Sequence, residues 1–157
     1  TLHNTLFPYT TLFRSRLREA ILDSRGGLGP ADVLDMAVHA AGGDYFRGLV
    51  TAHNLLKNVA QTDRGQYDGP QAAEDRLIES RLMDLAPPEA PGADNMGPWY
   101  HLFAVGLLDA VGTPIIGQLG ARTENLDFTH GVDRYEAAVN VLGASAFSGG
   151  TFVREFE

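Results

Sequence analysis

Cysteine is absent from the 157-residue chain. Its absence excludes a disulfide-stabilised scaffold, thiolate metal sites and a thiol nucleophile. The chain is nevertheless long enough to bury a hydrophobic core of ordinary size without crosslinks. Cysteine usage does not fix the cellular compartment, so the sequence leaves localisation open.

Lysine is almost absent as well, because Lys57 is the only one. The basic residues are scattered, and the formal net charge is −8. Binding to a phosphate backbone draws on clustered Lys and Arg, so nucleic acid is excluded as an expected partner. The preference for Arg over Lys, with abundant Ala, Gly and Asp, is typical of GC-rich bacterial coding.

Long hydrophobic runs are also lacking. The most apolar stretch, 99–111, is interrupted by His101, Gly106 and Asp109, and it falls short of the roughly 18 apolar residues that a membrane-spanning helix needs. The chain contains no phosphate-binding loop, dinucleotide fingerprint, His-Glu-x-x-His zinc motif or Gly-x-Ser-x-Gly elbow. The sequence therefore identifies no cofactor.

Residues 5–15 read Thr-Leu-Phe-Pro-Tyr-Thr-Thr-Leu-Phe-Arg-Ser. This string resembles the in-frame translation of a common short-read sequencing adapter at all eleven positions. We expect residues 1–15 to be a library artefact, set aside like a tag; the alternative is a native β-rich arm. Without them the net charge is −9, since they hold Arg14 and no acid. The natural N-terminus would then lie upstream, which leaves secretion open.

Proline marks several expected helix starts, at Pro30, Pro70 and Pro98, since the first helical turn tolerates its missing N–H. Glycine pairs at 26–27 and 42–43 predict helix ends, and Asp44 predicts an N-cap. The expected helices cover 16–25, 30–41, 45–61, 70–86 and 98–111, with a short helix or turn at 113–119 and a last helix from Asp133. Phe46 and Leu77 are expected to face the core, and Asp75 to face water.

The stretch 98–111 is apolar almost all round, which is typical of a helix at the centre of a bundle. We therefore expect residues 16–157 to form one mostly all-α domain, open to truncation at either end. It would be a bundle of five to seven helices around 98–111. A small β-element at the C-terminus, near 148–153, is compatible with this fold.

Histidine is the most informative residue for chemistry. His53 and His101 fall on expected helices that would pack together, so they are candidates for proton exchange or metal binding. The alternative, which we favour, is that both are core histidines with hydrogen-bond partners. Asp35 and His39 lie four residues apart, a spacing that suits a metal-ligand pair or an oriented base, although the helix macrodipole also favours acids in the first turn.

The segment 127–133 places His130 between Asp127 and Asp133 at spacings of three. A carboxylate beside a histidine orients its ring and raises its pKa, as in acid–base sites. Asp133 is also expected to cap a helix, with Glu136 at capping-box spacing. This cluster is the best catalytic candidate in the sequence, and no residue is assigned as a metal ligand.

The polar loop 61–68 contains Asp63, Arg64, Gln66 and Tyr67, a composition that suits contact with a sugar or a polar peptide. Trp99 and Tyr100 begin an expected helix and are candidates for lining a pocket mouth. The alternative for the loop residues is a solvated connection, and the alternative for Trp99 and Tyr100 is a place in the core.

Two functional hypotheses follow. The first, slightly favoured, is a binding or interaction domain, one part of a larger secreted or effector-type bacterial protein, whose partner is a protein, a polar small molecule or a glycan. The second is an acid–base or metal-assisted hydrolase of a polar polymer such as glycan. It would use residues from the set Asp127, His130, Asp133, His101 and His53.

Overall fold

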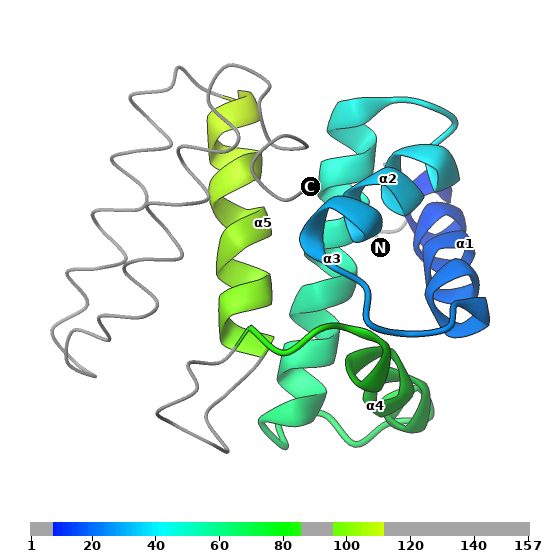
Figure 1. Ribbon diagram of the computed structural model, residues 1–157, viewed down its shortest axis with the longest axis vertical. Coiled ribbons are helices and arrows are strands. Elements are labelled where there is room, and N and C mark those ends of the chain that lie inside the picture. Colours follow the sequence, from blue (N-terminus) through cyan, green and yellow to red (C-terminus); the bar gives the residue numbers. More distant parts are fainter. Residues whose placement is uncertain (1–7, 86–95, 112–157) are drawn as a thin grey trace, which may run out of the picture. The chain divides into compact units, whose positions relative to one another are not determined.

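The computed structural model describes residues 8–85 and 96–111. Within these ranges the chain forms five helices and no strand, which confirms the mostly all-α prediction. The chain divides into two compact units, residues 1–83 and 84–157. Helices α1 to α4 belong to the first unit and α5 to the second (Figure 1).

Helix α1 spans Pro8–Asp23 and therefore begins earlier than the expected start at Arg16. Residues 8–15 are helical rather than a β-rich arm, while their adapter origin stays a prediction. Phe13, Leu17 and Ile21 recur every four residues and are buried, so they lie on one face of the helix. The helix ends as expected before Gly26 and Gly27, which have φ of 86° and 70°.

Helix α2 spans Pro30–Ala40, and its first turn is closed by Asp32, whose carboxylate accepts a hydrogen bond from the Gly29 N–H at 2.8 Å. Gly42 and Gly43 then turn the chain with positive φ. Asp44 caps the next helix, as expected, by accepting a hydrogen bond from the Arg47 N–H at 2.9 Å.

Helix α3 spans Tyr45–Asp63 and is the longest described helix. It contacts α1, α2 and α4, so it organises the core of the first unit. Its buried apolar side chains are Leu49, Ala52, Leu55, Leu56, Val59 and Ala60. The expectation that Phe46 is buried is wrong, because its side chain is 44% exposed. Phe46 lies in the first turn, where a helix end leaves side chains with fewer neighbours.

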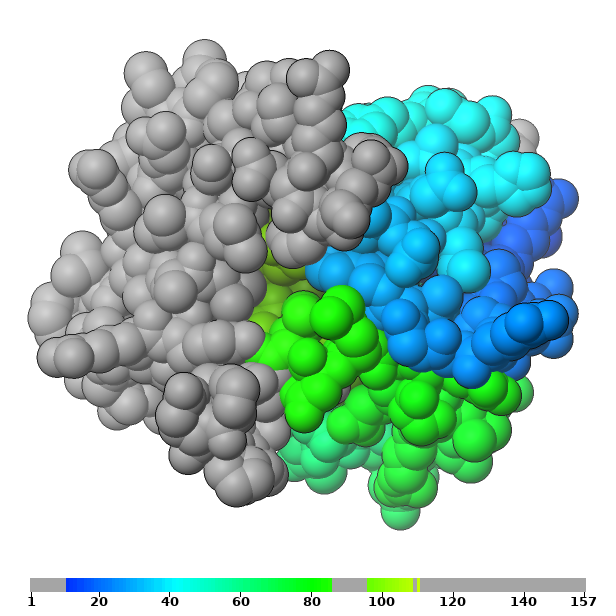
Figure 2. Space-filling model, viewed as in Figure 1, coloured from blue at the N-terminus to red at the C-terminus, as the bar shows by residue number. Residues whose placement is uncertain are grey.

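Helix α4 spans Ala72–Arg81 and is shorter than the expected 70–86. Its start is delayed because Gly69 and Pro70 lie in a turn, with the Ala72 N–H donating to the Gly69 carbonyl at 3.0 Å. Its end comes early because Leu82 is extended and pairs with Leu28 in a parallel bridge. The two bridged segments adjoin on the face shown in Figure 2.

The buried side of α4 also differs from the expectation. Asp75 is 1% exposed, whereas Leu77 is 54% exposed. The buried positions are Ala72, Asp75, Ile78 and, after the helix, Leu82. Their spacing of three or four residues defines one face, and the apolar Leu77 lies off that face.

Helix α5 spans Met96–Val111, two residues longer at its start than expected. Trp99 and Phe103 are fully buried, with their rings stacked at a centroid distance of 6.4 Å. None of the described helices is long and apolar enough to cross a membrane. The expected elements at 113–119, from Asp133 and near 148–153 lie outside the described residues.

Candidate functional site

A polar pocket lies within the first unit, between the last turns of α3 and the start of α4. Its volume is about 230 Å³, and it is lined by Asn58, Gln61, Tyr67, Gln71 and Asp75. Asn58 and Gln61 are three residues apart on α3, while Gln71 and Asp75 are four apart at the start of α4. Both spacings place side chains on one helix face, so the two helices present opposite polar walls.

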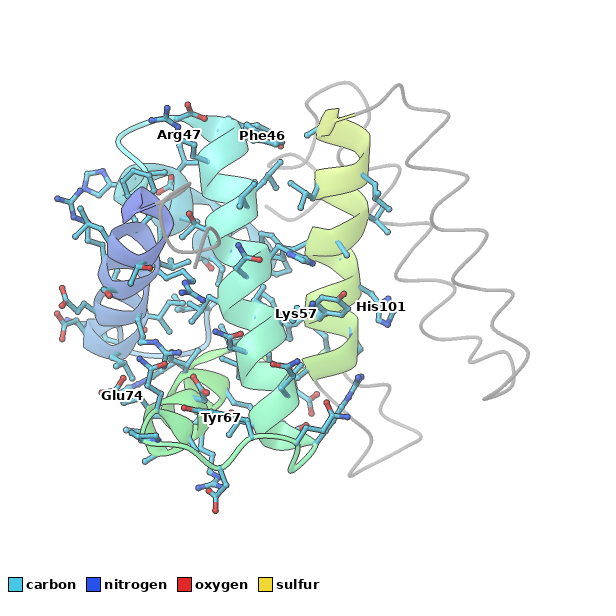
Figure 3. The ribbon with its side chains drawn as sticks, turned by 180° about the vertical axis from the view of Figure 1, so that it is seen from behind. Phe46, Arg47, Lys57, Tyr67, Glu74 and His101 are labelled. Carbon is cyan, nitrogen blue, oxygen red and sulfur yellow. The ribbon has the colours of Figure 1, made fainter. Side chains whose placement is uncertain are left out.

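Tyr67 stands in the connection between these walls, at the opposite end of α3 from Phe46 (Figure 3). Its side chain is 38% exposed. A Cβ atom added to Gly69 would collide with the Tyr67 hydroxyl and ring carbons. The ring therefore lies directly over Gly69, and the missing side chain at that position lets Tyr67 fold back toward the pocket.

A buried charge network holds Asp75 in place. Its Oδ2 accepts a hydrogen bond from the Thr62 hydroxyl at 2.7 Å, and its Oδ1 lies 2.7 Å from Arg18 Nη2. Arg18 is 8% exposed, and its Nη1 also lies 3.6 Å from a carboxylate oxygen of Glu74. Arg18 Nη2 lies within ion-pair distance of Asp75 Oδ1, but this contact does not have the geometry of a hydrogen bond. The network joins α1, α3 and α4, and it compensates Asp75, the charged residue among the described lining of the pocket.

The predicted loop residues divide into two groups. Tyr67 lines the pocket, whereas Asp63, Arg64 and Gln66 are exposed and do not belong to its lining. Their contact with a ligand stays a prediction. Trp99 is fully buried in α5 and Tyr100 is half-buried beside His101, with ring centroids 5.4 Å apart. The prediction that these two aromatics contact a ligand is likewise untested.

The predicted histidines lie in different units, His53 on α3 and His101 on α5. Both side chains are half-buried. Burial lowers the pKa of His53 below its ordinary value of 6.5, and the charge of Lys57 acts in the same direction. A hydrogen bond with the Asn54 side chain opposes this shift without cancelling it. His53 is therefore biased toward the neutral imidazole.

The other acid–base candidates are not assembled by the described residues. Asp127, His130 and Asp133 lie outside them, so the catalytic cluster stays a prediction. Asp35 and His39 are both exposed on α2. No group of three or more His, Asp or Glu side chains within 8–85 and 96–111 is arranged to hold a metal ion.

Four pocket residues were not among the predicted ligand-binding residues: Asn58, Gln61, Gln71 and Asp75. Gln61 is the first residue of the polar loop 61–68, and Asn58 lies one helical turn before it, which is a recognisable signal. Gln71 and Asp75 are harder to find, because their part in the pocket depends on how α4 packs against α3. The position of Asp75 on the 72–75–78–82 stripe was the available sign that it is buried.

Comparisons with protein-family models, with curated proteins and with solved structures gave no match to this chain. The site must therefore be interpreted from its own chemistry.

Proposed function

We propose that this protein is a binding domain that holds a small polar ligand in the pocket between α3 and α4. The observation that supports the proposal is the lining itself: three primary amides, a phenol and one compensated carboxylate gathered around about 230 Å³. A few converging polar groups in a concavity are the usual means of orienting a small ligand.

The pocket also rests on a rigid support, which favours binding over a chance surface hollow. Two of its walls are helices, and the Arg18–Asp75–Thr62 network ties those helices together below the surface. Sites built on packed elements are held more precisely than sites on loops alone. Gln61 and Gln71 are exposed, so they are available to a ligand from solution.

The test is a protein-observed NMR titration of the complete 157-residue chain with a panel of small polar compounds. The panel contains neutral sugars, adenosine, lysine, glutamate and inorganic phosphate. We expect at least one compound to shift the backbone amide signals of residues 58–75 in a saturable manner. Failure of every compound to shift those signals at 20 mM would contradict the proposal.

Two variants locate the binding site. Gln61→Ala removes an amide from the pocket wall, and Gln66→Ala removes the same side chain from an exposed position of the same connection that does not line the pocket. Binding in the pocket predicts a weaker affinity for the first variant and an unchanged affinity for the second. Equal losses in both would place the ligand elsewhere on the loop.

A further inference from the structure

The pocket presents hydrogen-bonding groups without a net charge. Asp75 is the one charged residue among the described residues that line it, and Arg18 lies 2.7 Å from its carboxylate at a position that is itself buried. A cationic ligand near Asp75 would meet the positive charge of Arg18. An anionic ligand would find no cation among the described lining residues, in a chain whose net charge is −8. The pocket therefore disfavours a cationic and an anionic ligand alike, which favours a neutral ligand.

The amides define what kind of neutral ligand fits. Asn58, Gln61 and Gln71 each offer an N–H donor and a carbonyl acceptor, and they come from both walls of the pocket. A hydroxyl group is also a donor and an acceptor at once. A ligand with hydroxyl groups around its periphery can therefore pair with both walls.

Tyr67 supplies a surface of a different kind. Its ring is partly exposed at the pocket and is held over Gly69. Tyrosine combines an apolar ring face with a polar hydroxyl at low conformational cost, which suits it to ligands that are themselves part apolar and part polar. A sugar ring has such a character, with C–H groups on one face and hydroxyls at its edge.

The size of the pocket sets a limit on the ligand. Its volume of about 230 Å³ is below the roughly 300 Å³ at which pockets for drug-sized ligands begin. We infer that the α3–α4 pocket accommodates one neutral saccharide unit, with Tyr67 against the ring face and the three amides on the hydroxyls. This inference rests on the proposed function, because it names the ligand class of the same pocket.

The panel separates this inference from the proposal on which it rests. Glucose, galactose, mannose and N-acetylglucosamine are titrated separately beside adenosine, lysine, glutamate and phosphate. We expect at least one sugar to bind with a Kd on the order of 1 mM, and the charged compounds to bind at least tenfold more weakly. If adenosine or a charged compound shifts residues 58–75 and no sugar does, the saccharide inference is overturned while the proposed pocket stands. If no compound shifts them, the proposed function itself fails.

Variants then test the assigned contacts with the best sugar. Tyr67→Ala and Gln61→Ala should each weaken binding about tenfold, since each removes a contact worth up to roughly one order of magnitude in affinity. The matched controls are Tyr45→Ala and Gln66→Ala, which change exposed side chains of the first unit outside the pocket lining. If a control variant loses as much affinity as the pocket variant to which it is matched, the assigned contact is overturned.

Gly69→Ala provides an independent check, because it changes none of the described residues that line the pocket. The added methyl group forces the Tyr67 ring away from its position. We expect a severalfold weaker Kd for the sugar with a small change in folding stability. Unchanged affinity would show that the ring does not contact the ligand and would overturn the role given to Tyr67.

Discussion

The two halves of α3 share an apolar core but differ in one further contact each. In the N-terminal half, Gly48 lies against α2 so closely that an added Cβ would stand 2.9 Å from the Cα and the N of Val38. In the C-terminal half, Thr62 joins a buried network with Arg18 of α1 and Asp75 of α4. Both halves bury apolar side chains, but the N-terminal half adds a close contact with the backbone of α2 and the C-terminal half adds a buried charge network.

The difference matters because the two kinds of packing fail in different ways. Close apolar packing is sensitive to volume, so an added methyl group is costly where the neighbour is backbone. A buried ion pair contributes little net stability when it is intact, but removal of one partner leaves a charge in a poorly solvated place. The N-terminal contact should therefore be sensitive to added volume, and the C-terminal network to loss of charge.

The largest expected effect is that of Asp75→Asn, which keeps the shape of the side chain and removes its charge. Arg18 would then be buried with Glu74, which is 52% exposed, as its one remaining carboxylate partner among the described residues. We expect the free energy of unfolding to fall by about 3 kcal/mol, measured by urea denaturation. Replacing Arg18 with Met in the same chain should recover part of the loss, because it removes the uncompensated charge.

The matched control for this prediction is Asp68→Asn. Asp68 pairs with Arg76 at 3.4 Å, but its side chain is 86% exposed. The same substitution should therefore change stability by no more than about 0.5 kcal/mol. If the two variants have equal stabilities, the distinction between the halves of α3 does not hold.

A smaller loss is expected in the N-terminal half for Gly48→Ala. Alanine favours a helix over glycine by about 1 kcal/mol, but its methyl group would overlap the backbone of Val38 in α2. Overpacking of this kind costs about 1–3 kcal/mol, so we expect a net loss of about 1 kcal/mol in urea denaturation. A more stable variant would show that α2 can move away at no cost.

Val38→Ala distinguishes backbone overlap from side-chain overlap at this contact. Two of the three nearest atoms to the added Cβ belong to the Val38 backbone and only one, Cγ2, to its side chain. Shortening Val38 should therefore not restore the stability of Gly48→Ala. Full recovery in the double variant would indicate that Cγ2 alone causes the overlap.

The same contrast explains which parts of the fold could be predicted from the sequence. Glycine and proline act locally, so the ends at Gly26 and Gly42 and the cap at Asp44 follow from the residue types alone. The end of α4 does not, because Leu82 leaves the helix to pair with Leu28 more than fifty residues earlier. Pairing between distant segments overrides local helix propensity here.

The candidate site shows the same limit. Tyr67 was predicted because aromatic and polar residues cluster in one loop, whereas Asp75 was expected to face water as an ordinary helix acid. Its burial requires a partner, and that partner, Arg18, lies on a helix 57 positions earlier in the sequence. The buried stripe of α4 marks the position of Asp75, but the partner that compensates its charge cannot be assigned from the periodicity of one helix.

The smallest expected effect is a pH dependence from His53, in the N-terminal half of α3. Burial lowers its pKa in the folded protein below the ordinary value of 6.5, so between the two pKa values the unfolded chain binds more protons than the folded one. Stability is then fully present above about pH 6.5 and is lost as the pH falls through the folded pKa. Wild type and His53→Gln are compared by urea denaturation at pH 7.5 and 5.5. We expect the stability of the wild type relative to His53→Gln to decrease at the lower pH. A difference that is the same at both pH values would contradict the lowered pKa.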